Sequence, residues 1–130
     1  MLKRIYPKNQ KGFTLLEMMS VLVIMGIMVS VVIKKYDLLS NTASITAIKS
    51  GVRELNTRET LVWTKIKLSE AGWSNDEDVY NEVDTELGAE YSWIPDPPPS
   101  TGGTLSYKSQ SVVLTRTEST MNSVGSWHKN

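Results

Sequence analysis

Residues 13–33 read FTLLEMMSVLVIMGIMVSVVI, a run of 21 residues whose only charge is Glu17. A helix of this length spans about 30 Å at ~1.5 Å per residue, which matches the hydrocarbon core of a bilayer. Two lysines follow Ile33 directly and end the apolar run. The sequence therefore predicts one membrane-spanning helix with Phe13 and Ile33 at its ends.

The charges on either side of this run predict its orientation. The residues ahead of it carry no acid and four basic side chains, Lys3, Arg4, Lys8 and Lys11. Basic residues on one flank favour an N-terminus on the cytoplasmic side, with the rest of the chain across the membrane. A cleaved secretory signal has an apolar stretch of only ~7–15 residues followed by a small-residue cleavage site. This run is longer and no such site follows it, so we expect a retained anchor.

Composition limits what the rest of the chain does. The protein has 130 residues, which leaves room for one small domain beyond the apolar run, and it has no cysteine to form a disulfide. The net charge is zero, yet removal of residues 1–12 would leave ten basic against 14 acidic residues. Residues 70–90 alone hold eight acids and no base. The net basicity of nucleic-acid-binding domains is absent, so we expect no nucleic-acid partner.

Residues 11–17, KGFTLLE, form the most specific motif in the chain. This string resembles the prepilin peptidase site of type IV pilins and type II secretion pseudopilins. The resemblance implies cleavage between Gly12 and Phe13, methylation of the new terminal nitrogen of Phe13, and identity of Glu17 with the family's glutamate. Gly26 falls where the family often has a glycine. The resemblance is close over residues 11–33 and extends to the remainder only in architecture.

Elementary chemistry agrees with these roles. Gly12 has no side chain to hinder a peptidase. A carboxylate inside a membrane helix costs about 2.5–3.5 kcal/mol, so Glu17 needs a partner or a place near the interface. The Phe13 amine of a neighbouring subunit is one such partner, and this charge pair would set the register between helices. The alternative is that Glu17 lies at the interface, solvated or protonated.

The next stretch, residues 36–71, has the periodicity of an amphipathic helix. Its apolar residues recur every three or four positions, with Glu59 in the one gap: Ile45, Ile48, Val52, Leu55, Val62 and Ile66. We expect this helix to continue from the membrane span, to be weakened at Gly51 and to be capped at Gly72 after Ala71.

A short acidic helix and three strands are predicted after it. Ser74 and Glu77 have the spacing of a capping box, and the helix would end at Gly88 with Val79, Val83 and Leu87 on one face. Strands are expected over residues 91–94, 104–108 and 111–117, with a proline-rich connection at 95–99 and a turn near Ser109 and Gln110.

The predicted fold is therefore α+β and pilin-like: a long N-terminal helix whose membrane-spanning half leads into an amphipathic half, packed on a small antiparallel β-sheet. Residues 1–12 would be the leader peptide, 13–33 the transmembrane and assembly helix, and 34–130 the head, with its helix ending at about residue 71.

The head shows no pattern that predicts catalysis. Phosphate-binding loops, nucleophile elbows and zinc-protease motifs are absent, and His128 has no orienting acid beside it, so we expect no enzyme and no cofactor. Four acids suggest calcium, but their spacing fits no known loop, so we expect no metal: Asp76, Glu77, Asp78 and Asp84. The methionines of the span are expected to fill gaps in packing. Basic and aromatic residues expected near the tip of the head are Lys108, Arg116, Trp127 and Lys129.

The resemblance implies a structural subunit of a filament. The first hypothesis is a pseudopilin of a type II secretion-like system; the alternative is a major or minor type IV pilus pilin in adhesion, motility or DNA uptake. Lys34 stands where filament pilins commonly have proline, which favours the pseudopilin. Expected partners are further copies or other pilin-like subunits, prepilin peptidase, an inner-membrane assembly platform and membrane lipid. The expected location is the bacterial inner membrane, single-pass, with the head in the periplasm, and then the filament.

Overall fold

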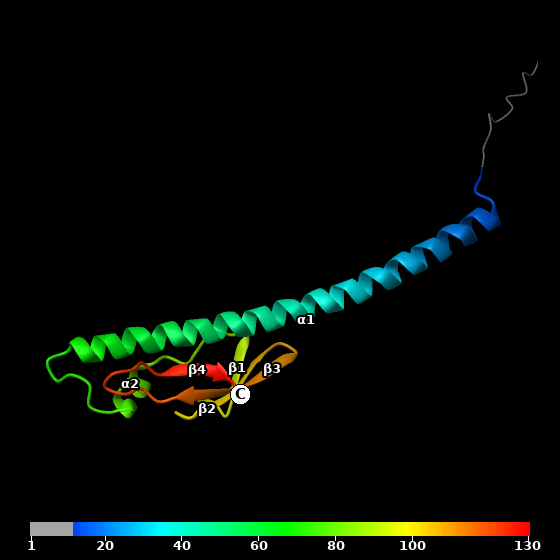
Figure 1. Ribbon diagram of the computed structural model, residues 1–130. Helices are drawn as coiled ribbons and strands as arrows, with labels where there is room; N and C mark the ends of the chain where they lie inside the picture. Colours follow the sequence, from blue (N-terminus) through cyan, green and yellow to red (C-terminus); the bar gives the residue numbers. More distant parts are fainter. Residues whose placement is uncertain (1–11) are drawn as a thin grey trace, which may run out of the picture. The chain divides into compact units, whose positions relative to one another are not determined.

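The computed structural model describes residues 12–130, so the basic residues of the predicted leader lie outside the described part. Its first element, α1, is a 54-residue helix, Leu15–Leu68 (Figure 1). The chain divides into two compact units, the first reaching to Leu38 and the second comprising Leu39–Asn130. Each unit is described by itself below.

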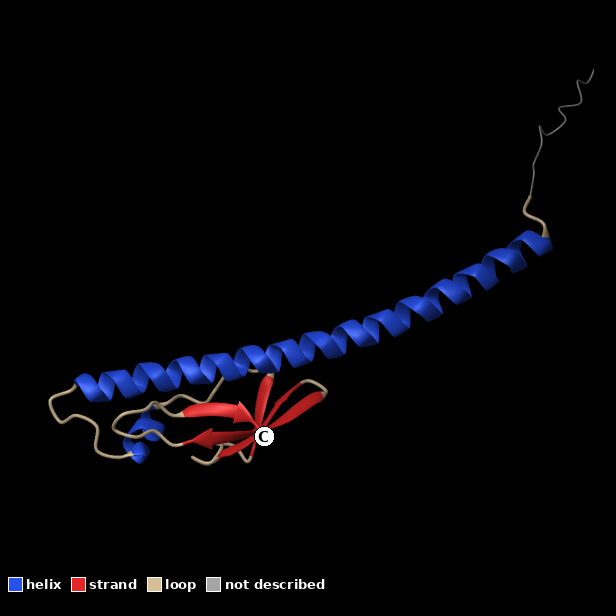
Figure 2. Cartoon of the chain, viewed as in Figure 1, coloured by secondary structure: helices blue, strands red, loops and turns tan. Residues whose placement is uncertain are grey.

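The first unit consists of the N-terminal part of α1, residues 15–38, and the residues that precede it (Figure 2). All its described side chains are exposed, among them the apolar residues of the predicted span. By length and composition, α1 contains a segment that is able to cross a membrane. The helix continues through Lys34 without interruption, as expected where no proline breaks the backbone hydrogen bonds.

The second unit contains the C-terminal part of α1, residues 39–68, which we call its lower half, together with a short helix and a four-stranded antiparallel sheet. This arrangement confirms the predicted α+β fold. Helix α2 is Asp76–Glu82, and the strands are β1 (Tyr91–Ile94), β2 (Gly102–Tyr107), β3 (Gln110–Thr117) and β4 (Ser126–Lys129). The sheet order follows the chain, β1-β2-β3-β4. All three predicted strands are present; β4 was not predicted.

The β2–β3 hairpin turns one residue earlier than expected. Tyr107 pairs with Gln110, which leaves Lys108 and Ser109 as the two-residue turn. Lys108 takes the left-handed conformation that such turns require, with φ of 52°. The turn predicted near Ser109 and Gln110 is therefore present, one position earlier in the chain.

The core lies between α1 and the sheet. Ile48 and Leu55 of the helix pack with a set of buried residues on all four strands: Trp93, Leu105, Leu114 and Trp127. Gly51, expected only to weaken the helix, lies in this contact. A Cβ atom there would come within 3.0 Å of Tyr91 Cε1 and 3.1 Å of Leu87 Cδ1. The glycine thus lets the helix approach this part of the head closely.

The buried face of α1 differs from the predicted stripe. It consists of Ser44, Ile48, Gly51, Leu55 and Glu59. Ile45 is instead 45 % exposed. The small residues Ser44 and Gly51 belong to this face because they permit close packing, a property that apolar periodicity does not report. Glu59, predicted as a gap in the stripe, is fully buried.

Helix α2 is shorter than predicted and begins one residue later. Its N-cap is Asn75, not Ser74, and the side-chain oxygen of Asn75 accepts a hydrogen bond of 3.0 Å from the Asp78 amide. The helix ends at Glu82, because the next residue, Val83, is already extended. Helix α1 likewise ends at Leu68, before the predicted Ala71.

Candidate functional site

The predicted cleavage bond lies just ahead of α1. Gly12 and Phe13 precede the helix, and the Phe13 side chain is 82 % exposed. A Cβ atom on Gly12 would meet no atom within 4 Å. Among the described residues nothing covers Gly12 or Phe13, so a peptidase has access to the backbone at this bond.

Thr14 and Glu17 form a reciprocal cap at the start of α1. The Glu17 amide donates to Thr14 Oγ1 at 3.2 Å, and the Thr14 amide donates to Glu17 Oε2 at 3.3 Å. The first backbone bond of the helix runs from the Met18 amide to the Thr14 carbonyl at 3.1 Å. This is a capping box, in which two otherwise unpaired donors of the first turn are satisfied. The role of Thr14 was not predicted, although Thr-x-x-Glu before an apolar run is its sequence signature.

The cap gives Glu17 a function within its own chain. Its carboxylate compensates the positive end of the helix dipole and fixes the point where the helix begins. The contact is long and exposed, and an ionised carboxylate has about four acceptor positions. Glu17 therefore keeps capacity for a second donor while it caps its own helix.

This short segment is also where the chain resembles known proteins. A family model, the prokaryotic N-terminal methylation motif, matches residues 7–33. Over this segment the chain is pilin-like. The match supports a type IV pilin-like family and implies processing by prepilin peptidase and filament assembly with pilin subunits. A family of structural subunits also suggests that this pilin-like chain is not an enzyme. No curated protein and no solved structure matches it.

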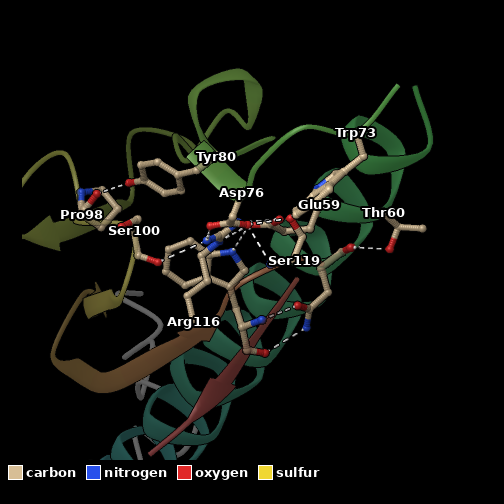
Figure 3. Close-up of polar contacts among 11 residues, drawn as sticks. Glu59, Thr60, Trp73, Asp76, Tyr80, Pro98, Ser100, Arg116 and Ser119 are labelled. Atoms are coloured by element: carbon tan, nitrogen blue, oxygen red, sulfur yellow. Dashed lines mark hydrogen bonds and ion pairs between the residues drawn. The ribbon is translucent and has the colours of Figure 1, made fainter. Parts of the chain in front are cut away.

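A second cluster, buried in the head, is built around Arg116 of β3 (Figure 3). Its guanidinium donates to Glu59 of α1 from Nε at 2.5 Å and from Nη2 at 3.1 Å. It donates to Asp76 of α2 from Nη1 at 2.6 Å and from Nη2 at 2.8 Å, and to the Ser100 carbonyl at 3.3 Å. These five bonds use all five donors of the side chain. One residue thus joins both helices and the sheet of the pilin-like head.

The surroundings of this cluster complete its hydrogen bonding. Trp127 Nε1 donates to Glu59 at 3.0 Å, and Ser119 donates to Asp76 from its amide and its hydroxyl, both at 2.7 Å. A Cβ atom on Gly125 would lie 2.9 Å from the Thr117 carbonyl and 3.1 Å from Glu59 Oε2. The chain therefore has room to pass over the cluster only with glycine at 125.

The cluster keeps its charges. Burial would raise the pKa of Asp76, but hydrogen bonds from Arg116 and Ser119 and the guanidinium charge lower it below its ordinary value of 3.8. Burial would likewise lower the pKa of Arg116, but the two carboxylates raise it well above its usual range. Burial raises the pKa of Tyr80, whose ring centroid lies 5.1 Å from the guanidinium carbon. The arrangement is an ion-pair clamp that joins α1, α2 and β3.

The cluster corrects the expected exposure of two residues. Arg116 and Trp127, expected as exposed tip residues, are 4 % and 2 % exposed, while Lys108 and Lys129 are at the surface. Asp76, one of the four acids considered for calcium, is instead held by Arg116 and Ser119. Within residues 12–130, no group of three or more metal-binding side chains is placed to hold an ion.

A signal for the clamp was present in the sequence. Glu59 interrupts an apolar helix stripe. Arg116 lies two residues after Leu114 in the same strand, so its side chain points to the same face as Leu114, which faces the core. Opposite charges at two buried-face positions predict a pair, because a buried charge needs a partner. What the sequence alone does not indicate is the third member, Asp76, since acids at a helix start already have a local explanation.

Proposed function

We propose that this chain is a subunit of a type IV pilus-like filament, most specifically a pseudopilin of a type II secretion-like system. In this proposal prepilin peptidase cuts between Gly12 and Phe13, and the Phe13 nitrogen is methylated. The observation that carries the proposal is the methylation motif at the start of a helix whose apolar side chains over residues 15–38 are all exposed. Such a surface needs lipid before assembly and neighbouring helices after it.

The proposed mechanism uses the new amine. Cleavage creates a positive charge at Phe13, four residues from Glu17. When subunits stack with a stagger, the amine of one meets Glu17 of the next, and each charge offsets the desolvation cost of the other. Glu17 caps its own helix at the same time, so its carboxylate would be held in position before the neighbour arrives.

Two features favour the pseudopilin over a pilus pilin. Lys34 stands in place of the usual proline, and no cysteine is present to form a disulfide-bonded loop. The alternative is a major or minor pilin in adhesion, motility or DNA uptake. Burial of Arg116 and Trp127 removes two of the four side chains that would support adhesion or DNA binding at the tip. In either system we propose an inner-membrane precursor with a cytoplasmic N-terminus and a periplasmic head, extracted by an assembly platform.

The processing step has a direct test. Mass spectrometry of the protein from a host with prepilin peptidase should give a mature N-terminus at Phe13 that carries one methyl group. Gly12→Val should remain uncut, because its branched side chain crowds the bond that the peptidase must reach. Gly26→Val is the matched control: it adds the same side chain within the helix and should be cut normally. A mature terminus at Met1, or at any position after Ile33, would refute the assignment.

A further inference from the structure

A groove in the head is apolar inside and basic at its rim. Its volume is about 320 Å³, and it lies between α1 and β3 in the second unit. The apolar walls include Ile48, Val52, Val112 and Leu114. The basic side chains that line it are Lys49, Arg53 and Lys129. We call this surface the basic-rimmed groove.

These three cations differ from the others of the second unit. Arg58, Lys65 and Arg116 each form an ion pair, at 3.0 Å with Glu54, 3.0 Å with Glu82 and 2.5 Å with Glu59 respectively. Two further lysines also have contacts: Lys67 with the Met121 carbonyl and Lys108 with the Tyr107 ring. Among the described Lys and Arg side chains of the second unit, only the three at the groove make no ion pair, no hydrogen bond and no contact with an aromatic ring. The cations of this unit that have no partner therefore gather around one apolar surface.

The complementary surface lies on the same chain, around α2. Glu77 and Glu118 line one polar hollow there and have no ion pair among the described residues. Three residues after Glu118, Met121 is 62 % exposed. The loop that carries it is fastened to α2 by the bonds from Ser119 to Asp76. We call these three residues the acidic surface.

The two surfaces lie at opposite ends of the lower half of α1. The groove includes Lys49, whereas Lys65 forms an ion pair with Glu82 of α2. Figure 1 shows α2 near the C-terminal end of α1. Sixteen residues of helix separate these lysines, which corresponds to about 24 Å. One chain therefore has no means of placing its acidic surface in its own groove.

We propose that the basic-rimmed groove is the docking site for the acidic surface of a second copy of this chain. Met121 would enter the apolar groove, and Glu77 and Glu118 would meet Lys49, Arg53 and Lys129 at its rim. Charge complementarity of this kind fixes register and excludes like-charged alternatives. Because the contact joins two different patches, it repeats from copy to copy and, when the rotation between copies does not close a ring, generates an open filament. The inference rests on the proposed function and adds to it a contact between heads.

Charge reversal tests the contact in the full chain. Lys49→Glu with Arg53→Glu should lower the fraction of subunit in sheared filaments roughly tenfold, because like charges then face each other across the contact. Glu77→Lys with Glu118→Lys should do the same. The four changes together restore opposite charges and should recover assembly. Full assembly by either double variant overturns the proposal, as does failure of the fourfold variant when its head melts at the parent's temperature.

Cysteine crosslinking identifies the occupant, since the chain has no cysteine of its own. A variant with Lys49→Cys and Glu77→Cys, treated with a short bifunctional thiol reagent in filaments, should give a ladder of covalent oligomers. Either substitution alone should give no ladder, and Ser92→Cys with Glu77→Cys is the matched control on the exposed strand β1. Dimers from Lys49→Cys alone, or products with a different protein, would overturn the proposal.

The outcomes separate this inference from the proposed function. A parent that is cut after Gly12 and assembles, but whose groove variants assemble equally well and give no ladder, refutes only the contact between heads. A parent that is never cut after Gly12 refutes both.

Discussion

The two units of this protein differ in where their apolar side chains lie. In residues 12–38 every side chain is exposed, although most of those within the span are apolar. In Leu39–Asn130 a set of large apolar side chains forms a core, and no described buried side-chain polar atom lacks a partner. The second unit is therefore complete within one chain, whereas the first needs lipid or other subunits. Folding of the core is thus confined to the second unit, whereas assembly requires the first.

Two glutamates of α1 show the same difference between the units in their partners. Glu17 and Glu59 both interrupt an apolar pattern in the sequence. Glu59 is fully buried and bound by Arg116 and Trp127, so its partners are internal. Glu17 is exposed and has only a local bond to Thr14. A glutamate in an apolar stripe thus indicates a partner, and its position relative to the folded head determines whether that partner is in the same chain.

The largest expected effect is on the stability of the head and concerns Arg116, the internal partner of Glu59. Arg116→Leu leaves two carboxylates without their counter-charge, so the free energy of unfolding of the head should fall by about 3–5 kcal/mol. Urea unfolding of a fragment that starts at Thr42 measures this. Arg53→Leu, at an exposed arginine without an ion pair, is the control and should stay within about 0.5 kcal/mol. A loss below about 1 kcal/mol, typical of a surface ion pair, would show that the clamp contributes little.

At Glu17, by contrast, a substitution should affect the assembly of subunits. Glu17→Leu lowers the cost of lying in lipid, so the variant should insert and be cut after Gly12 as the parent is, while assembly falls sharply. An amine left unpaired among apolar helices costs about 2.5–3.5 kcal/mol on insertion scales. The measurement is the fraction of subunit in sheared filaments relative to membranes.

Glu17→Gln separates charge from hydrogen bonding at this position. The amide keeps an acceptor for the Thr14 cap but carries no charge, so assembly should fall as it does for leucine. Unchanged assembly of Glu17→Leu would leave the carboxylate as a cap and an interfacial residue only, and the charge-pairing proposal would be wrong even if processing at Phe13 holds.

The smallest expected effect is a dependence of head stability on pH. The pKa of Asp76 is lower in the folded head than its ordinary value of 3.8, so below that value the unfolded chain binds more protons than the folded one. The stability that Asp76 contributes is complete above this range and is lost as pH falls through the folded pKa. The difference in unfolding free energy between the parent fragment and Asp76→Asn should therefore shrink on acidification from pH 6 to about 3. A constant difference would contradict this.

Periodic and motif-based features were predictable from the sequence. The long helix, the strands at residues 91–94, 104–108 and 111–117, and the processing motif all depend on local patterns, and the structure or the family match supports them. Strand β4 was missed because Ser126–Lys129 is short and mixed in polarity. Its pairing with β3 and the contact of Trp127 with α1 hold it in place.

Corrections to the predictions concern distant contacts. Gly51 and Ser44 lie on the buried face of α1 because of what packs against them, which helix periodicity alone does not report. Arg116 and Trp127 were assigned to the surface because their residue types are common there, whereas their partner Glu59 is 57 and 68 residues away in the chain. Charge partners at such separations are set by the tertiary fold.

The contact between α1 and β4 also sets an order of events in time. Asn56 donates to the Trp127 carbonyl at 3.0 Å and accepts from the Trp127 amide at 2.6 Å, across 71 residues of chain. The helix is synthesised first, so Asn56 and Glu59 stay in water until the segment with Trp127 has been made. Closure of so long a loop delays folding. The head is therefore finished only after translation has passed Trp127, and a ribosome that stalls earlier leaves Glu59 without its Trp127 partner.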